Sequence, residues 1–378
     1  MVMDDARRET CCRIVEAIEE VGPSVPAVAR QLGLKLGRVR SFVDHYVRGP
    51  EGFDLVPVVD YARLGMRVYS VVLAPFPRFR PAAKTFFSAM GELGYAWTYG
   101  TTLPQAYIVV SFAVPEELYD RHVMMVGRLE ERGLFHIVRM QRDDMVVRPK
   151  TSQEALDLDG YGWQFDWDSR RDLEQNAPIR PSVRAEYDAE DLKAINGWQR
   201  QATSPPRSYR MAGIADGWPM ERRTLEWHLR DHVVGRRLVT GYRFRWPGAV
   251  NPHAEGRRRV RSLVTVELQV SDPSGRELLE LRKAVQSVPF LWTERIGMDY
   301  TAQFHFPIED IIPAYRFIAK AMEPFEDRSA SYMLSRSEAL EFPLWSELYA
   351  GGEGWTLDEE GLVARAERTQ PLLKPSWK

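Results

Sequence analysis

The amino-acid sequence predicts an α+β protein in which two helix-turn-helix domains alternate with two ferredoxin-like βαββαβ domains, as an internal tandem repeat. Two observations predict this fold. Short segments of the first half recur in the second half in the same order, and each half shows the same succession of helix-period and strand-period apolar patterns. With 378 residues, 44% of them hydrophobic and 11% aromatic, the chain is long enough for several domains with cores of their own.

Four pairs of segments carry the evidence for a duplication. The members of each pair lie 186 to 195 residues apart. Because the order is kept and the spacing changes only by loop-sized steps, we favour duplication over the alternative, two unrelated α+β halves that share a few Trp and Pro residues. The pairs are Val28–Leu34 with Ile214–Met220, Tyr95–Thr98 with Phe290–Thr293, Val114–Glu117 with Phe306–Glu309, and Gly160–Trp163 with Gly352–Trp355.

Three helices are predicted at the start of each half, with a tight turn between the second and the third. In the first half, Glu9–Glu20 has apolar residues on one helix face, and Ser24 can cap a second helix that runs to about Leu32. Gly33 breaks the chain, and a third helix is expected over Lys35–Val47. The second half repeats this plan with helices over 192–201, 208–216 and 221–235, the turn Gly217–Pro219, and a β-wing over Arg236–Arg245.

A strand–helix–strand–strand–helix–strand pattern follows each helical domain, which is the order of the ferredoxin-like fold. In the first half the elements are Arg67–Ala74, Pro81–Leu93, Tyr95–Thr101, Ala106–Val114, Pro115–Arg132 and Phe135–Gln141. In the second half they are Leu263–Val270, Gly275–Gln286, Phe290–Ile296, Thr301–Phe306, Pro307–Met322 and Ser329–Ser335. The expected domains are 1–50 (helix-turn-helix), 60–148 (ferredoxin-like), 149–187 (aromatic linker), 188–250 (winged helix-turn-helix), 256–345 (ferredoxin-like) and 346–378 (C-terminal tail). The aromatic linker and its C-terminal counterpart are expected to pack back onto the sheets.

Three segments of the second half, together with Asp60–Gly65, carry a resemblance to a known family. Ile214–Ala215, Thr224–Arg230 and Leu238–Tyr242 resemble the second helix, the recognition helix and the exit into the wing of the leucine-responsive (Lrp/AsnC-type) transcription regulators. The resemblance implies a DNA-binding regulator whose ferredoxin-like (RAM-like) domains pair and are available to a small-molecule effector. Because two such units share one chain, the architecture resembles a covalent pseudo-dimer.

The third helix of each unit offers the side chains that DNA recognition needs, which are cations for phosphates and polar groups for base edges. The alternative is an ordinary solvated helix face. The candidates are Lys35, Arg38, Arg40, Ser41, His45 and Arg48 in the first unit, and Arg222, Arg223, Thr224, Trp227, His228, Arg230, Arg236 and Arg237 in the second. The basic run Arg257–Arg261 is either a further phosphate contact or a solvated lead-in to a strand.

Two other patterns in the sequence could indicate ligand binding. His228 and His232 have the spacing of a zinc site on one helix face, but Leu229 stands where the catalytic motif has Glu and no third ligand is evident, so we expect no metal. Trp97–Thr98 and Trp292–Thr293 recur at the same place in both halves. They are candidates for an effector pocket or a sheet interface, and the alternative is that each Trp fills a core.

Enzyme signatures such as Gly-x-Ser-x-Gly, the phosphate loop and the dinucleotide fingerprint do not occur, so we expect a regulator and not an enzyme. One alternative is an enzyme on the same scaffold, because siroheme decarboxylases resemble Lrp-type proteins and use two related units. In that case His122, His136 and His305 are the residues to suspect. The other alternative is a sensor or interaction protein that does not bind DNA.

The composition of the chain limits where in the cell we expect the protein and which partners we expect it to bind. The net charge of −2 does not exclude DNA binding, because phosphate contact needs local clusters of Lys and Arg. Cys11 and Cys12 are adjacent and provide no disulfide framework. The sequence has no run of about 18 apolar residues that could span a membrane, and its N-terminal residues lack the apolar core of a secretory signal. We therefore expect a cytoplasmic protein with double-stranded DNA and a second copy of itself as partners, no membrane contact and no cofactor.

Overall fold

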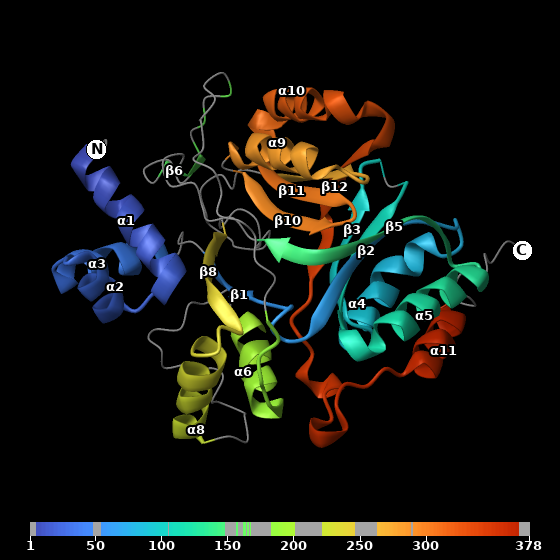
Figure 1. Cartoon of the computed structure of the whole chain (residues 1–378), viewed down its shortest axis with the longest axis horizontal. Helices are drawn as coiled ribbons and strands as arrows, with labels where there is room; N and C mark the ends of the chain where they lie inside the picture. The colour runs from blue at the N-terminus through green and yellow to red at the C-terminus, as the bar shows by residue number, and fades with distance from the viewer. Residues whose placement is uncertain are drawn as a thin grey trace, which may run out of the picture.

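The computed structural model describes residues 5–47, 54–104, 106–147, 156–157, 162–163, 165, 167, 183–200, 221–245, 263–288 and 290–369. Several predicted features lie outside these residues, namely the second helix and turn of the second helix-turn-helix domain (208–219) and the basic run at 257–261. The architecture is the α+β arrangement predicted from the sequence, with the helix-turn-helix elements on one side of a strand barrel (Figure 1). Among the described residues, no helix combines the length and apolar character that crossing a membrane requires.

The first helix-turn-helix domain consists of α1 (Asp5–Val21), α2 (Val25–Leu32) and α3 (Leu36–Phe42), and α3 continues as a π-helical turn, η1 (Val43–Val47). Gly33 ends α2 at a φ of 65°, a left-handed conformation that glycine adopts without steric cost. The three helices bury an apolar core between them. The second domain repeats the pattern with α6 (Ala189–Arg200), α8 (Arg222–Trp227) and the π-helical turn η5 (His228–Val234).

Each half then forms the predicted βαββαβ unit. The first unit comprises β2 (Met66–Pro75), α4 (Ala83–Leu93), β3 (Ala96–Thr102), β4 (Ile108–Pro115), α5 (Tyr119–Glu131) and β5 (Phe135–Val147). The second comprises β9 (Leu263–Val270), α9 (Gly275–Gln286), β10 (Leu291–Gly297), β11 (Tyr300–Pro307), α10 (Ile311–Met322) and β12 (Ser329–Glu341). Short 3-10 turns precede or follow these helices at η2 (Arg80–Ala82), η3 (Glu116–Leu118), η7 (Ile308–Asp310) and η8 (Glu323–Arg328).

The eight strands of the two units close into one barrel, in the order β10-β11-β9-β12-β3-β4-β2-β5. Within each unit the first strand pairs with the third and the fourth, and the second strand pairs with the third. The two seams are equivalent as well, because the last strand of each unit (β5 or β12) pairs with the second strand of the other (β10 or β3). This pseudo-two-fold arrangement is what a tandem duplication produces. The helix layers lie on opposite sides of the barrel, α4 with α5 on one and α9 with α10 on the other (Figure 1).

The predicted wing of the second domain contains a strand, which pairs with a strand of the first half. The strand β8 (Val239–Arg245) pairs antiparallel with β1 (Asp54–Val59), a strand of the first half that the sequence analysis did not assign. Asp54 lies opposite Arg245, and Val56 lies opposite Arg243. The two strands occupy corresponding places in the repeat, so the expected wing is replaced by a ribbon that joins the two halves. We call this β1–β8 pair the ribbon.

Both aromatic segments pack onto the ferredoxin-like units, as expected. Trp167 stacks on Phe290, with ring centroids 5.7 Å apart, and Trp355 packs against Tyr95, with ring centroids 6.0 Å apart. Trp355 also donates a hydrogen bond from its indole Nε1 to the hydroxyl of Tyr187 in the linker at 3.0 Å. The small strands β6 (Leu156–Asp157) and β7 (Gly162–Trp163) pair with each other in the linker.

The expected C-terminal tail contains two short turns and a helix. The turns are η9 (Ser346–Leu348) and η10 (Gly351–Glu353), and the helix is α11 (Glu359–Thr369). Leu362 and Ala366 are buried in the core of the first half, and Glu359 forms ion pairs at 2.9 Å with Arg121 and Arg128 of α5. The segment is therefore part of the fold and covers the helices of the first unit.

Candidate functional site

The inner surface of the barrel is lined by polar residues. Strand β9 shows the pattern, because Val266 and Leu268 belong to the apolar core beneath α9 and α10, while the alternating Thr265, Glu267 and Gln269 are also buried. Successive side chains of a strand point to opposite faces, so these polar groups lie inside the barrel. Buried polar residues of the other barrel strands include Ser70 on β2, Ser111 on β4, Gln141 and Asp143 on β5, Arg295 on β10, Thr301 on β11 and Ser335 on β12.

A cluster of three buried charges lies at the β5–β10 seam. Arg295 Nη2 is 2.9 Å from a carboxylate oxygen of Glu267, and Arg295 Nε is 3.8 Å from a carboxylate oxygen of Asp143. The three side chains are 6% exposed or less. Asp143 belongs to the first half, and the other two residues belong to the second. The pairing of β5 with β10 brings them together, so the cluster exists only because the two halves share one barrel.

Hydrogen bonds hold this cluster in place. The Ser70 hydroxyl and the Gln141 amide lie 3.2 Å and 3.0 Å from the two carboxylate oxygens of Asp143, and both donate to it. Thr301 in turn donates to Gln141 Oε1 at 2.7 Å, and Arg295 donates to the hydroxyl of Ser111. The carboxylate of Asp143 is thereby fixed by partners from two neighbouring strands.

Two buried polar atoms of the barrel interior, one on Arg295 and one on Gln269, retain hydrogen-bonding capacity. Arg295 Nη2 and Gln269 Oε1 are fully buried and make no hydrogen bond to the described residues, although Nη2 is close enough to Glu267 to form an ion pair. Buried polar groups are normally paired, and groups that are not are frequent at functional sites. The interior therefore has a donor and an acceptor to offer to a bound molecule.

The charged cluster is not repeated by the pseudo-symmetry. Trp97 and Trp292 occupy equivalent positions in the two halves. The residue three positions after Trp292 is Arg295, whereas the residue three positions after Trp97 is Gly100. A purely architectural feature of the barrel would be expected in both halves. Among the side chains that the structure describes, the charged cluster is present at the β5–β10 seam and not at the equivalent β12–β3 seam. This difference indicates that the β5–β10 seam has become specialised.

The pKa of Asp143 is raised from its ordinary value of 3.8 to about 7. Burial is the main cause, because it disfavours the charged carboxylate, and the nearby charge of Glu267 adds to it. Arg295 and the hydrogen bonds from Ser70 and Gln141 act in the opposite direction. A carboxyl group with such a pKa can both donate and accept a proton near neutral pH, which is the property of a general acid or base.

A cleft of about 640 Å³ reaches Asp143 from outside the barrel. Its walls are the ribbon, the segment that leads into β2, and the end of β5. The volume is within the range of small-molecule sites, which is about 300–1,000 Å³. The lining includes Val58, Val59, Tyr61, Met66, Val68, Met145, Val146 and Val147 as apolar or aromatic surface, with Thr240 and Asp143 among the polar groups.

Two arginines and two acids also line this cleft. Arg67 forms an ion pair with Glu116 at 2.6 Å, and Arg184 lies over Gly65. A Cβ at Gly65 would lie 2.8 Å from Arg184 Nε, and the φ of Gly65 is 68°, so glycine leaves the space in which the guanidinium lies. The other acid, Asp60, lies 3.7 Å from Arg63. The cleft thus combines an apolar wall, exposed cations and a buried carboxyl group.

The three suspected histidines do not come together. His122 is fully buried on α5 and donates from Nε2 to the carbonyl of Gly94 at 2.6 Å, while Nδ1 accepts from the hydroxyl of Tyr69 at 2.6 Å. His136 is largely exposed beside Glu130, and His305 stacks on Trp292 with ring centroids 4.8 Å apart. Burial lowers the pKa of His122 to about 4, so this histidine is a neutral structural group.

We expect the free energy of unfolding to fall as the pH is lowered from about 6.5 to about 4. In the unfolded chain His122 has an ordinary pKa and binds a proton in this range, whereas in the folded chain it stays neutral. Lowering the pH therefore reduces the free energy of unfolding by about 3 kcal/mol in total. Urea titrations at pH 7, 5 and 4 measure this slope. The His122→Gln variant should lose it, and the matched His136→Gln variant should keep it. An unchanged slope in His122→Gln would contradict the assignment.

The DNA-contact candidates are mostly exposed. In the first domain Lys35, Arg38, Arg40, Ser41 and His45 are all exposed on α3 and η1, and Arg48 lies outside the described residues. In the second domain the exposed residues are Arg223, Thr224, Trp227, Arg230 and Arg237, and Arg236 is half-buried. The side chain of Arg222 is outside the described set.

His228 differs from our expectation, because it is buried and points toward α6, where its Nδ1 lies 2.7 Å from a carboxylate oxygen of Asp191. The side chain of His228 is thus held inside the domain and is not presented on the outer face of the helix. The DNA-contact role of the exposed residues stays a prediction.

The two tryptophan positions have different surroundings. Trp97 is buried against Tyr61, with ring centroids 5.2 Å apart, and fills the core of the first half. Trp292 is half-buried, and the guanidinium of Arg243 lies 4.0 Å from its ring centroid. Trp292 therefore joins the barrel to the ribbon. Thr98 is half-buried and Thr293 is buried.

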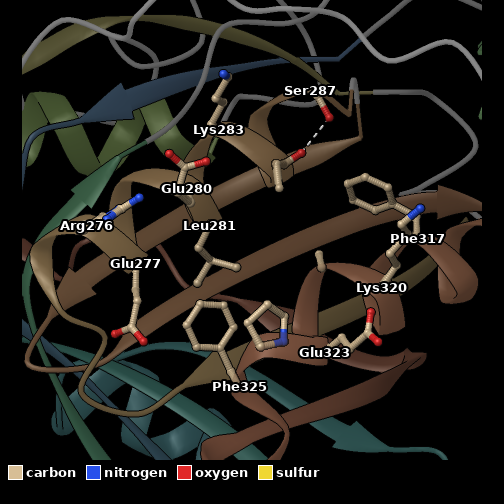
Figure 2. Close-up of a pocket in the computed structure, with 13 residues that line it drawn as sticks. Arg276, Glu277, Glu280, Leu281, Lys283, Ser287, Phe317, Lys320, Glu323 and Phe325 are labelled. Atoms are coloured by element: carbon tan, nitrogen blue, oxygen red, sulfur yellow. Dashed lines mark hydrogen bonds between the residues drawn. The ribbon is translucent and has the colours of Figure 1, made fainter.

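A second cleft, of about 580 Å³, lies outside the barrel between α9 and the α10–η8 segment. Figure 2 shows Leu281 and Phe325 at its floor and the charged groups of Glu277, Glu280 and Lys283 around it. The charged residues of this lining are exposed or half-buried. Unlike the cleft at Asp143, this cleft has no buried carboxyl group among the residues that line it, so the cleft at Asp143 is the stronger candidate.

Comparisons with known proteins place the chain beside a small set of solved structures. No family model matches the chain, and no curated protein sequence matches it. The crystal structure of the siroheme decarboxylase NirDL is 12% identical over 94% of this chain and 99% of that chain, with a TM-score of 0.48. Its complex with an iron-uroporphyrin III analogue gives 12% identity, 93% and 98% coverage, and a TM-score of 0.47. An anthrone oxidase-like protein is 8% identical over 74% of this chain and 93% of that chain, with a TM-score of 0.34.

Our expectation that the chain is not an enzyme is corrected by these comparisons, because the similar structure that extends along nearly the whole chain is an enzyme. They give no support to transcription regulation. The sequence analysis looked for short catalytic motifs. It missed Asp143, Arg295 and Glu267, which lie far apart in the sequence. The available signal was the strict alternation of apolar and polar residues in Val264–Val270, in which Glu267 occupies an inward position.

Proposed function

We propose that this protein is an enzyme whose active site is the cleft at Asp143, and that Asp143 transfers a proton to or from an anionic organic substrate. The observation that carries the proposal is the buried Asp143–Arg295–Glu267 cluster at the end of an open cleft with cations in its wall. A buried carboxyl group with neighbours that set its protonation is typical of general acid–base catalysis.

Asp143 and the side chains that hold it have distinct roles in this proposal. Asp143 carries the proton that is transferred. Arg295 is a positioning residue, because its positive charge keeps the two buried acids in one site and its guanidinium lies beside both. Ser70 and Gln141 orient the carboxyl group by hydrogen bonds. Burial away from water strengthens each of these electrostatic interactions.

The reaction that fits this arrangement is decarboxylation. The bond between a carboxylate carbon and its neighbouring carbon breaks, carbon dioxide leaves, and the electron pair stays on the neighbouring carbon, which takes up a proton. A carboxylic acid that is still protonated near pH 7 can supply that proton, and Asp143 has this property. Exposed arginines hold the remaining carboxylates of a polyanionic substrate by charge-assisted hydrogen bonds.

The substrate class we propose is a carboxylate-bearing tetrapyrrole, of the kind named for the siroheme decarboxylase structures. The cleft supports this class through its own residues. Val58, Met66 and Val147 offer apolar surface to a flat macrocycle, and Arg67 and Arg184 offer cations to its carboxylates.

We expect iron-uroporphyrin III to bind the full chain in a one-to-one ratio, and the Arg184→Ala variant to bind it about tenfold more weakly, because one charge-assisted contact at a solvent-exposed site is lost. Absorbance titration at low salt measures both affinities. Arg78→Ala is the matched control, since Arg78 is also exposed but donates to the carbonyl of Gly133 away from the cleft. Equal affinity of all three proteins, or no binding to any of them, would contradict this substrate class.

A further inference from the structure

We propose that the second helix-turn-helix domain binds a divalent transition metal of the zinc type through His228, His232, Asp188 and Asp191. One ligand atom of each of these residues lies within 4.8 Å of those of the others. The Nδ1 atoms of His228 and His232 are 2.7 Å and 3.1 Å from carboxylate oxygens of Asp191. Ligand atoms of a tetrahedral zinc ion, each 2.0–2.1 Å from it, lie about 3.3 Å apart. The separations in the structure, from 2.7 Å to at most 4.8 Å, lie on both sides of that distance.

Local structure explains how the four residues meet. His228 and His232 are four residues apart in the π-helical turn η5, so both imidazoles lie on the face directed at α6. Asp188 and Asp191 begin α6. The Asp188 carboxylate accepts from the backbone amide of Asp191 at 2.9 Å, and Asp191 accepts from the amide of Asp188 at 3.1 Å. This reciprocal pair fixes the direction of both carboxylates before any ion binds.

The first half of the chain supplies an internal comparison. The gap-free alignment of the two third helices, in which Val43 corresponds to Leu229, places Phe42 and Tyr46 at the positions of His228 and His232. Phe42 and Tyr46 are buried and pack together with ring centroids 4.8 Å apart. An apolar aromatic pair is therefore sufficient for this fold. The second half has replaced it by two imidazoles, which are metal ligands when neutral.

The electrostatics of the site favour a cation. The carboxylate of Asp191 is fully buried, and a buried charge is costly unless it is paired or coordinates a metal. Two carboxylates also outweigh the partial positive charge at the start of α6, which on its own would disfavour a cation. Two imidazoles with one or two carboxylates form a ligand set of intermediate softness, which suits zinc better than calcium or magnesium.

Bound metal would join α6 to the third helix of the same domain. Metal binding contributes to stability because the unfolded chain does not hold the four ligands together. The site is separate from the cleft at Asp143, so its test does not depend on the proposed enzyme activity.

The test is a zinc titration of the full chain after chelator treatment and removal of the chelator, read by competition with a chromophoric chelator. We expect one zinc ion per chain with a dissociation constant of about 1 µM or lower, and a higher midpoint of thermal unfolding when zinc is bound. The variant His232→Tyr restores the residue of the first half. It should keep the circular dichroism spectrum and bind zinc at least about a hundredfold more weakly.

Two further variants keep the proposal falsifiable. Asp188→Asn changes a half-exposed side chain and should weaken zinc binding about tenfold even if His232→Tyr does not fold. His136→Tyr alters an exposed histidine outside the site and should bind zinc as the wild type does. The proposal is overturned if the wild type binds no zinc at micromolar concentration, or if Asp188→Asn and His232→Tyr bind it as tightly as the wild type. In that case the four residues form only a hydrogen-bonded helix cap.

Discussion

Replacement of Asp143 by Asn is expected to lower kcat/KM by about 10²–10⁴-fold, because the amide has nearly the same shape but cannot donate the carboxyl proton. The hydrogen bond from Ser70 can be kept, and the amide removes only the titratable function. Decarboxylation of iron-uroporphyrin III by wild type and variant, followed by mass spectrometry of the tetrapyrrole, measures the difference. Asp120→Asn changes an exposed acid on α5 and should leave the rate unchanged.

The pH dependence of the wild type has a defined direction. If Asp143 acts as the acid, the rate is highest where its carboxyl group is protonated and declines as the pH rises through about 7. The Asn variant should not show this decline. A rate that instead increases through pH 7 would make Asp143 the base, and a wild-type profile that is flat between pH 5 and 9 would contradict any role in proton transfer.

Replacement of Arg295 by Met is expected to destabilise the protein by about 3–5 kcal/mol at pH 7.5, which is the typical cost of removing one partner of a buried ion pair. The methionine side chain fills similar space, but Glu267 and Asp143 are left as two buried acids without their shared cation. Urea unfolding followed by circular dichroism measures the loss.

The loss in Arg295→Met should be smaller at pH 5, because the buried carboxyl group of Asp143, whose pKa is raised to about 7, is then neutral and the cation is needed less. The double variant Arg295→Met/Glu267→Gln should recover part of the stability at pH 7.5, since one of the two uncompensated charges is gone. Arg78→Met, at an exposed position, is the control. A loss in Arg295→Met below about 1 kcal/mol at pH 7.5 would show that the charged cluster does not form as described.

Much of the architecture could be predicted from the sequence because it is encoded locally. Gly33 and the helix-period residues around it define a helix-turn-helix, and the recurrence of Trp97 at Trp292 indicates the duplication. The pairing of β1 with β8 could not be predicted in the same way. Both β1 and β8 have other candidate partners nearer in the sequence. The pairing of β1 with β8 is decided by the pseudo-two-fold packing of the two halves.

The candidate site was missed for a related reason. The strand expected from the sequence ends at Gln141, whereas β5 continues to Val147 and includes Asp143. Closure of the barrel then places Asp143 next to residues of the other half. The residues of the proposed metal site show the same limit. The spacing of His228 and His232 was visible in the sequence, but Asp191 joins them only through the packing of α6 against η5.

The central claim is that the barrel and its cleft at Asp143 form an active site for an anionic, carboxylate-bearing substrate. The most direct measurement is to incubate the purified full chain with iron-uroporphyrin III at pH 6.5 and follow the mass of the tetrapyrrole with time. We expect stepwise loss of carbon dioxide by the wild type and by Asp120→Asn, and a loss at least about a hundredfold slower by Asp143→Asn. Loss of carbon dioxide at the same rate in Asp143→Asn, or no turnover by the wild type under conditions in which the tetrapyrrole binds, would contradict it.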